Sequence, residues 1–371
     1  MIKHAGTLSE LGLWTFKTRS NRDFTKQLHA TAISEGTLIA TLFSHVAPFG
    51  EGPALHLTGL TLSHSRLQYS TRSLTTAIDF SGVKRLNLQH CHDADALLLA
   101  LTASFSGNTP ALEYFSYDGA PLQSSILEGF LQSFSGLGSL LLRYCTEATE
   151  AAPFNLSHLK HHRDSLQTLL LHMLNTHYTP GENDSFALSL QEVTAICEAC
   201  PRLQQIIIAP PMVTLGDAAG TAVQGPFGLA VDELAKLRHL RTLRIANWPV
   251  LPSENLLAVE EGPDGGLADD RRKAYLPFNQ QRVLNSMQIF ATDTMHRFAA
   301  SKGLRSVSRL PTIKIGAKRP ISAHVVVAHP HVEVQMKPVC ILATSQADRY
   351  GRQLIKAEHI RMEDHEYLEG S

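Results

Sequence analysis

The chain has 371 residues, enough to bury a substantial core, and carries 33 Lys and Arg against 34 Asp and Glu. This near-zero net charge gives no field that would attract nucleic acid or anionic lipid, so neither is expected as a partner. Residues 1–16 lack the apolar core of a signal peptide, and the longest leucine-rich stretch, 97–101, is far too short to span a membrane. Five cysteines, a low and odd count, favour a reducing compartment, the cytoplasm or the nucleus.

Residues 1–50 are expected to cover one end of the fold. The spacing of Leu8, Leu11, Leu13 and Phe16 fits a degenerate first repeat equally well. The sequence leaves an N-terminal cap and a degenerate repeat open as alternatives.

One apolar frame recurs through residues 51–250. Residues 80–91 and 134–145 share a Phe-Ser-Gly start, three apolar positions and a terminal Cys. The frame has apolar residues at positions 1, 4 and 6 and a small or special residue at position 9. Its seven copies are spaced by 25 to 37 residues and begin at Leu57, Val83, Leu112, Leu137, Leu166, Leu203 and Leu240. Such self-similarity at a nearly fixed period predicts a repeat architecture.

Each repeat is expected to form a strand, a turn and a helix. Positions 4 and 6 alternate inward on a short strand, while positions 3, 5 and 7 point to solvent. Capping boxes at residues 125–128 and 189–192 predict helix starts between the frames. The sequence therefore predicts an α/β leucine-rich repeat solenoid, a horseshoe with a parallel β ribbon on its concave face and helices on its convex face.

The last third of the chain is expected to finish the solenoid. Residues 251–280, charged and rich in Gly and Pro, predict a flexible insertion. Residues 281–320 predict a final repeat, with an amphipathic helix from Val283 to Phe298 and a strand at Leu310, Ile313 and Ile315. Residues 321–371 predict a C-terminal cap and tail, in which short strands near 325–327, 332–334 and 339–341 cover the exposed end of the ribbon.

Position 5 of the frames predicts a binding surface. Three successive frames carry Leu141, Leu170 and Ile207 there, which would form an apolar stripe on a face that ought to be wet. Apolar anchors beside Tyr and Arg are where binding energy concentrates. In the alternative, the insertion at 209–228 folds over the stripe. The candidate partner-binding residues are Tyr114, Leu141, Arg143, Leu170, His172, Ile207 and Arg244.

Catalytic and metal motifs give no candidate. Cys197 and Cys200 form half of a zinc-binding pattern without its other half, and the frame explains Cys91, Cys145 and Cys200 as buried apolar residues. Histidine pairs at 90/92, 161/162 and 329/331 lie at expected strand ends or loops, where a solvated or hydrogen-bonded imidazole is ordinary. No nucleophile with a recognisable base accompanies them, so we expect no enzyme, no metal and no cofactor.

The Cys-terminated frames at 91 and 145, together with Cys200-Pro-Arg-Leu203-Gln-Gln-Ile206-Ile-Ile208, resemble the cysteine-containing class of leucine-rich repeats. Over roughly residues 50–320 the chain is similar to the substrate-recognition arrays of fungal F-box proteins. The resemblance implies a protein-binding scaffold that presents a substrate as part of an SCF-type ubiquitin ligase. A Skp1-type adaptor is implied only if an F-box lies upstream, because residues 1–50 lack its Leu-Pro start. A ligase-independent adaptor and a regulator of a small GTPase or a nuclease are the alternatives.

Overall fold

The computed structural model describes residues 9–14, 55–68, 70–106, 109–146, 155–175, 187–211, 225–246, 269–302, 310–315, 321–325, 332–336, 340–347 and 353–360. The chain divides into two compact units. Unit 1 comprises Met1–Leu174 and Ala199–Arg202, and unit 2 comprises Asn175–Glu198 and Leu203–Ser371. Of the insertions predicted at 209–228 and 251–280, residues 212–224 and 251–268 lie outside the described residues.

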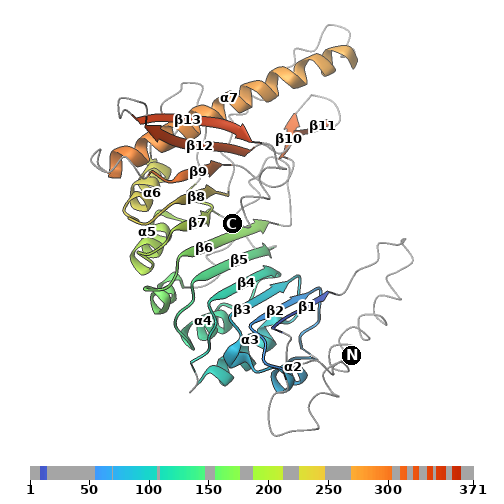
Figure 1. The fold of residues 1–371 in the computed structure, drawn as a ribbon. Coiled ribbons are helices and arrows are strands. Elements are labelled where there is room, and N and C mark those ends of the chain that lie inside the picture. The colour runs from blue at the N-terminus through green and yellow to red at the C-terminus, as the bar shows by residue number, and fades with distance from the viewer. Residues whose placement is uncertain are drawn as a thin grey trace. The chain divides into compact units, whose positions relative to one another are not determined.

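Unit 1 is built on a sheet whose strands follow one another in chain order (Figure 1). The strands are β1 (Glu10–Trp14), β2 (Gly59–Ser63), β3 (Arg85–Gln89), β4 (Tyr114–Gly119), β5 (Ser139–Thr146) and β6 (Thr168–Asn175). From β1 to β5 each strand pairs in parallel with the next, with equivalent frame positions opposite one another. Because Leu11 and Leu13 stand opposite Leu60 and Leu62, residues 10–14 continue the ribbon as a degenerate repeat would.

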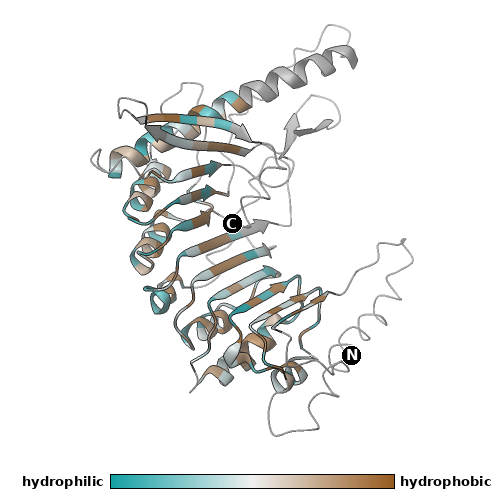
Figure 2. Cartoon of the chain, in the orientation of Figure 1, coloured by the Kyte–Doolittle hydropathy of each residue, from teal (hydrophilic) through white to brown (hydrophobic). Residues whose placement is uncertain are grey.

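The predicted core positions are confirmed. In all seven frames, positions 1, 4 and 6 are at most 5% exposed. Figure 2 shows the resulting alternation of apolar and polar residues along the strands. Leucines at equivalent positions of neighbouring strands stack in columns because a parallel ribbon repeats about every 4.8 Å.

Helices and short 3-10 turns link the strands of unit 1 and lie on one side of its sheet (Figure 1). They are α2 (Thr71–Ala77), η4 (Phe80–Gly82), α3 (Ala94–Phe105), α4 (Ser124–Gln132) and η5 (Leu156–His162). Between them and the sheet, Phe130 packs against Phe105, Phe115 and Phe134 with ring centroids 5.1 to 6.0 Å apart. This aromatic cluster holds the helices to the strand side chains that face them.

The capping box predicted at residues 125–128 is wrong. Helix α4 begins at Ser124, its N-cap is Gln123, and no side chain caps it. Ser125 is therefore already helical, where its hydroxyl cannot take the N-cap position. Glu128 instead accepts a hydrogen bond at 2.9 Å from the backbone N–H of Asn155, at the start of η5.

Unit 2 has a mixed sheet with the order β7, β8, β9, β12, β13. Strands β7 (Gln205–Ile208), β8 (Thr242–Ile245) and β9 (Thr312–Ile315) pair in parallel, which confirms the strand predicted at Ile313 and Ile315. Beyond them β12 (Cys340–Ala347) runs antiparallel to β9, and β13 (Gln353–Ile360) antiparallel to β12. The end of the ribbon is thus extended by a hairpin, while β10 (Ile321–Val325) and β11 (Val332–Met336) form a separate pair.

Three helices of unit 2 are described: α5 (Leu190–Ala199), α6 (Gly225–Ala235) and α7 (Asp269–Lys302). The capping box before α5 is confirmed, because Glu192 N–H donates to Ser189 Oγ at 3.3 Å and Ser189 N–H donates to Glu192 Oε2 at 2.6 Å. Helix α7 corrects the prediction of a flexible insertion over residues 251–280, since its first twelve residues, 269–280, fall within that range. Charged residues such as those at 269–273 occur in helices as well as in loops, so composition alone did not separate the two.

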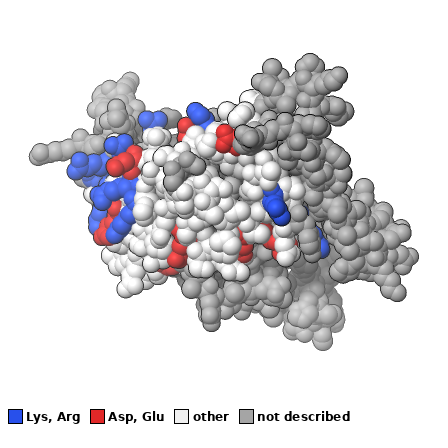
Figure 3. All heavy atoms as spheres, turned by 90° about the horizontal axis from the view of Figure 1, so that it is seen from below, with Lys and Arg blue, Asp and Glu red and all other residues white. Residues whose placement is uncertain are grey.

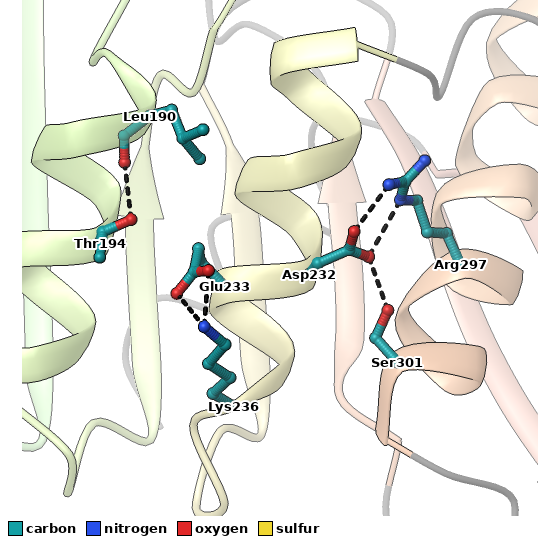
Figure 4. Close-up of polar contacts among 7 residues, drawn as sticks. All are labelled: Leu190, Thr194, Asp232, Glu233, Lys236, Arg297 and Ser301. Atoms are coloured by element: carbon teal, nitrogen blue, oxygen red, sulfur yellow. Dashed lines mark hydrogen bonds and ion pairs between the residues drawn. The ribbon is translucent and has the colours of Figure 1, made fainter.

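The C-terminal half of α7 is fixed to α6 by side chains (Figure 4). Asp232 accepts hydrogen bonds from Arg297 Nε at 3.0 Å, from Arg297 Nη2 at 2.6 Å and from the hydroxyl of Ser301 at 2.6 Å. Phe227 of α6 and Phe290 of α7 pack with ring centroids 5.2 Å apart. In the described part of the chain, no helix has the length and apolar character needed to cross a membrane.

Candidate functional site

In unit 1 the parallel register aligns the position-5 side chains Thr61, Asn87, Ser116 and Leu141 across β2 to β5. All four are half-buried, whereas positions 4 and 6 of the same strands are buried. Since successive side chains point to opposite faces, this column lies on the face opposite the core. We call positions 3, 5 and 7 of β3 to β5 the open face of unit 1: Arg85, Asn87, Gln89, Tyr114, Ser116, Asp118, Ser139, Leu141 and Arg143.

An ion pair joins two strands on the open face of unit 1. Asp118 and Arg143 stand opposite each other in the register of β4 and β5, and Arg143 Nη1 donates to Asp118 Oδ2 at 3.0 Å. The side chains keep 20% and 33% of their surface exposed, respectively. A partly desolvated guanidinium beside its carboxylate is a fixed, directional polar group rather than a mobile surface charge.

Two histidines extend this polar row along the carboxyl ends of the strands. His90 Nδ1 lies 4.0 Å from Asp118 Oδ1, and the His90 ring stacks on that of His64, with centroids 5.0 Å apart. Both occupy position 8 of their frames, and both have left-handed backbone, with φ of 55° at His64 and 50° at His90. Histidine tolerates this conformation better than most residues with a Cβ. The same backbone turn in consecutive repeats thus places the two rings side by side.

Tyr114 supplies the aromatic surface of the open face of unit 1. It is half-buried at position 3 of β4, between Arg85 of β3 and Ser139 of β5 in the register. Arg85 is exposed and forms an ion pair with Glu10 of β1. The structure therefore places Tyr114, Leu141 and Arg143 on one face of two neighbouring strands, as the frame predicted.

Asn87 presents a hydrogen-bond acceptor at the centre of the open face of unit 1. Its Oδ1 atom is buried and has no hydrogen-bond partner among the residues that the structure describes. Its neighbours in the register are Thr61 and Ser116. A buried acceptor without a donor costs free energy in the folded chain.

Leu170 corrects the predicted apolar stripe. It was expected on the wet face, yet it is 5% exposed, and its neighbours Leu169 and Leu171 are 0% and 5% exposed. Because side chains alternate between the two faces of a strand, burial of three in a row means that both faces of β6 are covered here. His172, two residues further along β6, is half-buried.

The remaining predicted residues, Ile207 and Arg244, belong to unit 2. They stand opposite each other in the register of β7 and β8, and Ile207 is half-buried. Arg244 was also expected on the wet face but is 8% exposed, as is Lys314, its register neighbour on β9. Of the three residues predicted to form the apolar stripe, only Leu141 lies half-buried on the open face of unit 1. In unit 2, Arg244 and Lys314 are buried, which the frame did not predict.

Each cysteine whose burial the structure describes has a buried thiol. Cys91, Cys197 and Cys200 form no disulfide, and burial raises the pKa of Cys91 to about 11 and that of Cys200 to about 12. Cys91 Sγ donates to the carbonyl oxygen of Leu62 at 3.3 Å. Among the described residues there is no group of three His, Cys, Asp or Glu side chains that could hold a metal ion.

Surface charges do not form a field of one sign. On the face seen in Figure 3, Lys and Arg gather toward one side with Asp and Glu among them, and most of the rest is uncharged. Several charges among the described residues pair locally, as Lys84 does with Glu113 at 3.5 Å and Lys236 with Glu233 at 2.6 Å. Exposed pairs of this kind are mutually neutralising and contribute little to binding or stability.

Comparison of the sequence with protein-family models finds no match, and comparison with curated proteins finds no relative. The function is therefore argued from the residues of the open face of unit 1.

Proposed function

We propose that this chain is a protein-binding scaffold of the leucine-rich repeat class and that a protein partner binds to the open face of unit 1. The observation that carries the proposal is the side-by-side placement of half-buried Tyr114, Leu141 and Arg143 on β4 and β5, above a core that the strands already fill. These side chains are not needed to complete that core.

The chemistry of the face suits a protein surface. Tyr and Arg are enriched among the residues that dominate binding energy at protein interfaces, and Leu141 provides an apolar anchor beside them. The ion pair between Asp118 and Arg143 supplies polar contacts of fixed direction. Such a mixture of apolar and directional polar groups is typical of reversible protein interfaces.

The more specific form of the proposal is a substrate receptor of an SCF-type ubiquitin ligase. It rests on the resemblance of the Cys-terminated frames alone, which is an analogy of fold and not of site. Copurification of a Skp1-type adaptor with the full chain would support it. A partner bound without that adaptor would favour a ligase-independent role, and a small GTPase or a nuclease as partner would identify the chain as a regulator of that protein.

The test compares affinity purification of the wild-type chain with two variants of the open face, Tyr114→Ala and Leu141→Asp. A matched control is Leu99→Asp, because Leu99 is 59% exposed on α3 of the same unit. Mass spectrometry should identify a protein that wild type and the control retain and both face variants lose. Titration of that purified protein should then give at least a tenfold weaker Kd for each face variant. Equal binding by all four proteins would refute the proposal.

A further inference from the structure

Strand β13 ends the sheet of unit 2 with a long edge. Among the strands that the structure describes, β13 pairs with β12 alone, and that pairing runs along its whole length from Gln353 to Ile360. Along the other side of β13, every second residue therefore directs its backbone N–H and C=O groups away from β12. An edge of this kind is a template for pairing with another strand.

The side chains of β13 separate into two faces. Leu354, Lys356 and Glu358 are exposed, with 58% for Leu354 and side-chain values of 67% and 52% for the two charged residues. Between them, Ile355 and Ala357 are half-buried, and α7 packs against this strand. The exposed face of β13 thus carries one apolar, one basic and one acidic side chain at every second position.

The charges on this face have no counterpart on the neighbouring strand. Lys356 stands opposite Thr344 of β12, and Glu358 stands opposite Leu342. The two charged side chains form an ion pair with each other along β13. The pairing of β13 with β12 therefore does not use either charge as a cross-strand contact.

This spacing makes β13 complementary to itself. In an antiparallel pair of two copies centred on Ala357, Lys356 of each copy stands opposite Glu358 of the other, twice. We propose that a second copy of this chain binds to β13 edge to edge, in this antiparallel register, and that the chain thereby forms a symmetric dimer. Opposite charges directly across an antiparallel pair are favourable, and each dimer has two such pairs.

The alternative registers are worse for a physical reason. A shift of the twofold axis by one residue, to Lys356 or to Glu358, places two like charges directly opposite each other. A register whose axis falls between two residues places the exposed face of one copy against the half-buried face of the other. Of the registers near the middle of β13, the one centred on Ala357 alone joins the same faces and opposite charges.

A lone Lys on an edge strand usually deters pairing. Here Glu358 lies two residues from Lys356 on the same face, so in the proposed register each Lys356 meets an opposite charge instead of an uncompensated one. The contact of one strand edge is small beside a standard interface of about 1,600 Å², so the dimer is expected to be reversible and dependent on concentration. The proposal is independent of the binding function above, because none of its residues lies on the open face of unit 1.

The test is sedimentation velocity of the full chain over a concentration series, with Lys356→Glu, Glu358→Lys and the double variant. Each single variant converts both opposite-charge pairs into like-charge pairs and should weaken self-association about tenfold. The double variant restores both pairs and should return to the wild-type Kd. Both side chains are exposed, and circular dichroism with the unfolding midpoint checks that each variant is folded.

A mixture of the two single variants separates this proposal from a role within one copy. The variants carry complementary charges, so the mixture should form a heterodimer more tightly than either variant forms a homodimer. The ion pair within β13 is broken in both, so it cannot give this recovery. In the wild-type chain, hydrogen exchange of β13 backbone amides should slow as concentration rises. A monomer at every concentration, or a mixture no more associated than its components, would overturn the proposal.

Discussion

His162 Nε2 lies 3.0 Å from the carbonyl oxygen of Leu131, and both residues are buried between α4 and η5 of unit 1. On the other side of the ring, the backbone N–H of Leu137 donates to Nδ1 at 3.4 Å. The imidazole therefore uses one nitrogen as acceptor and the other as donor, which only the neutral ring can do. Sequence reasoning treated residues 161 and 162 alike, but His161 is exposed and His162 joins Leu131 of α4 to Leu137, the first residue of the fourth frame.

This arrangement predicts a dependence of stability on pH. Burial lowers the pKa of His162 from 6.5 to about 4. Between these values the unfolded chain binds a proton that the folded chain excludes, so the contribution is full above pH 6.5 and is lost as pH falls toward 4. The loss should approach about 3 kcal/mol in the free energy of unfolding.

Urea unfolding at several pH values measures this loss. Carboxylates with lowered pKa values, such as Asp79, also reduce the stability of the folded chain when they are protonated in acid. The variant His162→Gln therefore separates the contribution of the histidine from theirs. Glutamine offers one donor and one acceptor but does not titrate, so its profile should be flatter between pH 4.5 and pH 6.5. His161→Gln is the matched control and should keep the wild-type slope. Equal slopes for all three proteins would show that His162 is not the titrating group.

Leu170 and Leu141 predict losses of stability of different size for the same substitution. Both occupy position 5 of neighbouring frames, but Leu170 is 5% exposed and Leu141 is half-buried. Leu170→Asp places a carboxylate where both faces of the strand are covered, and should cost about 3 kcal/mol or more. Leu141→Asp should cost less than about 1 kcal/mol, because its carboxylate can reach water. Unfolding midpoints in urea compare the two, and equal losses would contradict the assignment of faces.

That contrast shows how far the repeat pattern predicts this fold. A period of two fixes which side chains alternate, so positions 4 and 6 could be assigned to the core from Leu60 to Ile245. The same pattern cannot tell whether the second face of a strand is covered, as it is at Leu170, because a period of two assigns side chains to faces and does not say what packs on each face. Nor did the frame predict β13. The alternation of exposed and half-buried side chains along residues 354–358 can be assigned to two faces only when the pairing with β12 is known. The stacking of His64 on His90 had a signal in the sequence, a histidine at position 8 of two successive frames.

The contact between α6 and α7 predicts a local change in dynamics. Asp232 and Arg297 form a two-point ion pair, with side chains 32% and 28% exposed. Hydrogen bonds from Arg297, which has the larger effect, and from Ser301 hold the pKa of Asp232 below its usual value. Asp232→Asn should weaken this pair and destabilise the packing of α7 by about 1 to 2 kcal/mol. Hydrogen exchange in residues 283–302 should become faster.

A matched control for this variant is Lys236→Gln, at the residue that directly follows the last residue of α6. Lys236 pairs with Glu233 one turn away, but its side chain is 67% exposed. Exposed ion pairs contribute little, so hydrogen exchange in α7 should remain unchanged. If both variants changed exchange in α7 equally, the ion pair of Asp232 with Arg297 would not be what holds the helix.

The buried thiols predict selective resistance to alkylation. The thiolate is the reactive form, and pKa values of about 11 for Cys91 and about 12 for Cys200 leave almost none of it at pH 8. Burial adds a steric barrier, since the two residues are 3% and 0% exposed. Iodoacetamide treatment followed by peptide mass spectrometry should leave both unmodified in the native chain and modify both in urea. Rapid native labelling of Cys91 would mean that the start of α3 opens readily, because Cys91 lies just ahead of that helix and can react only when it is exposed.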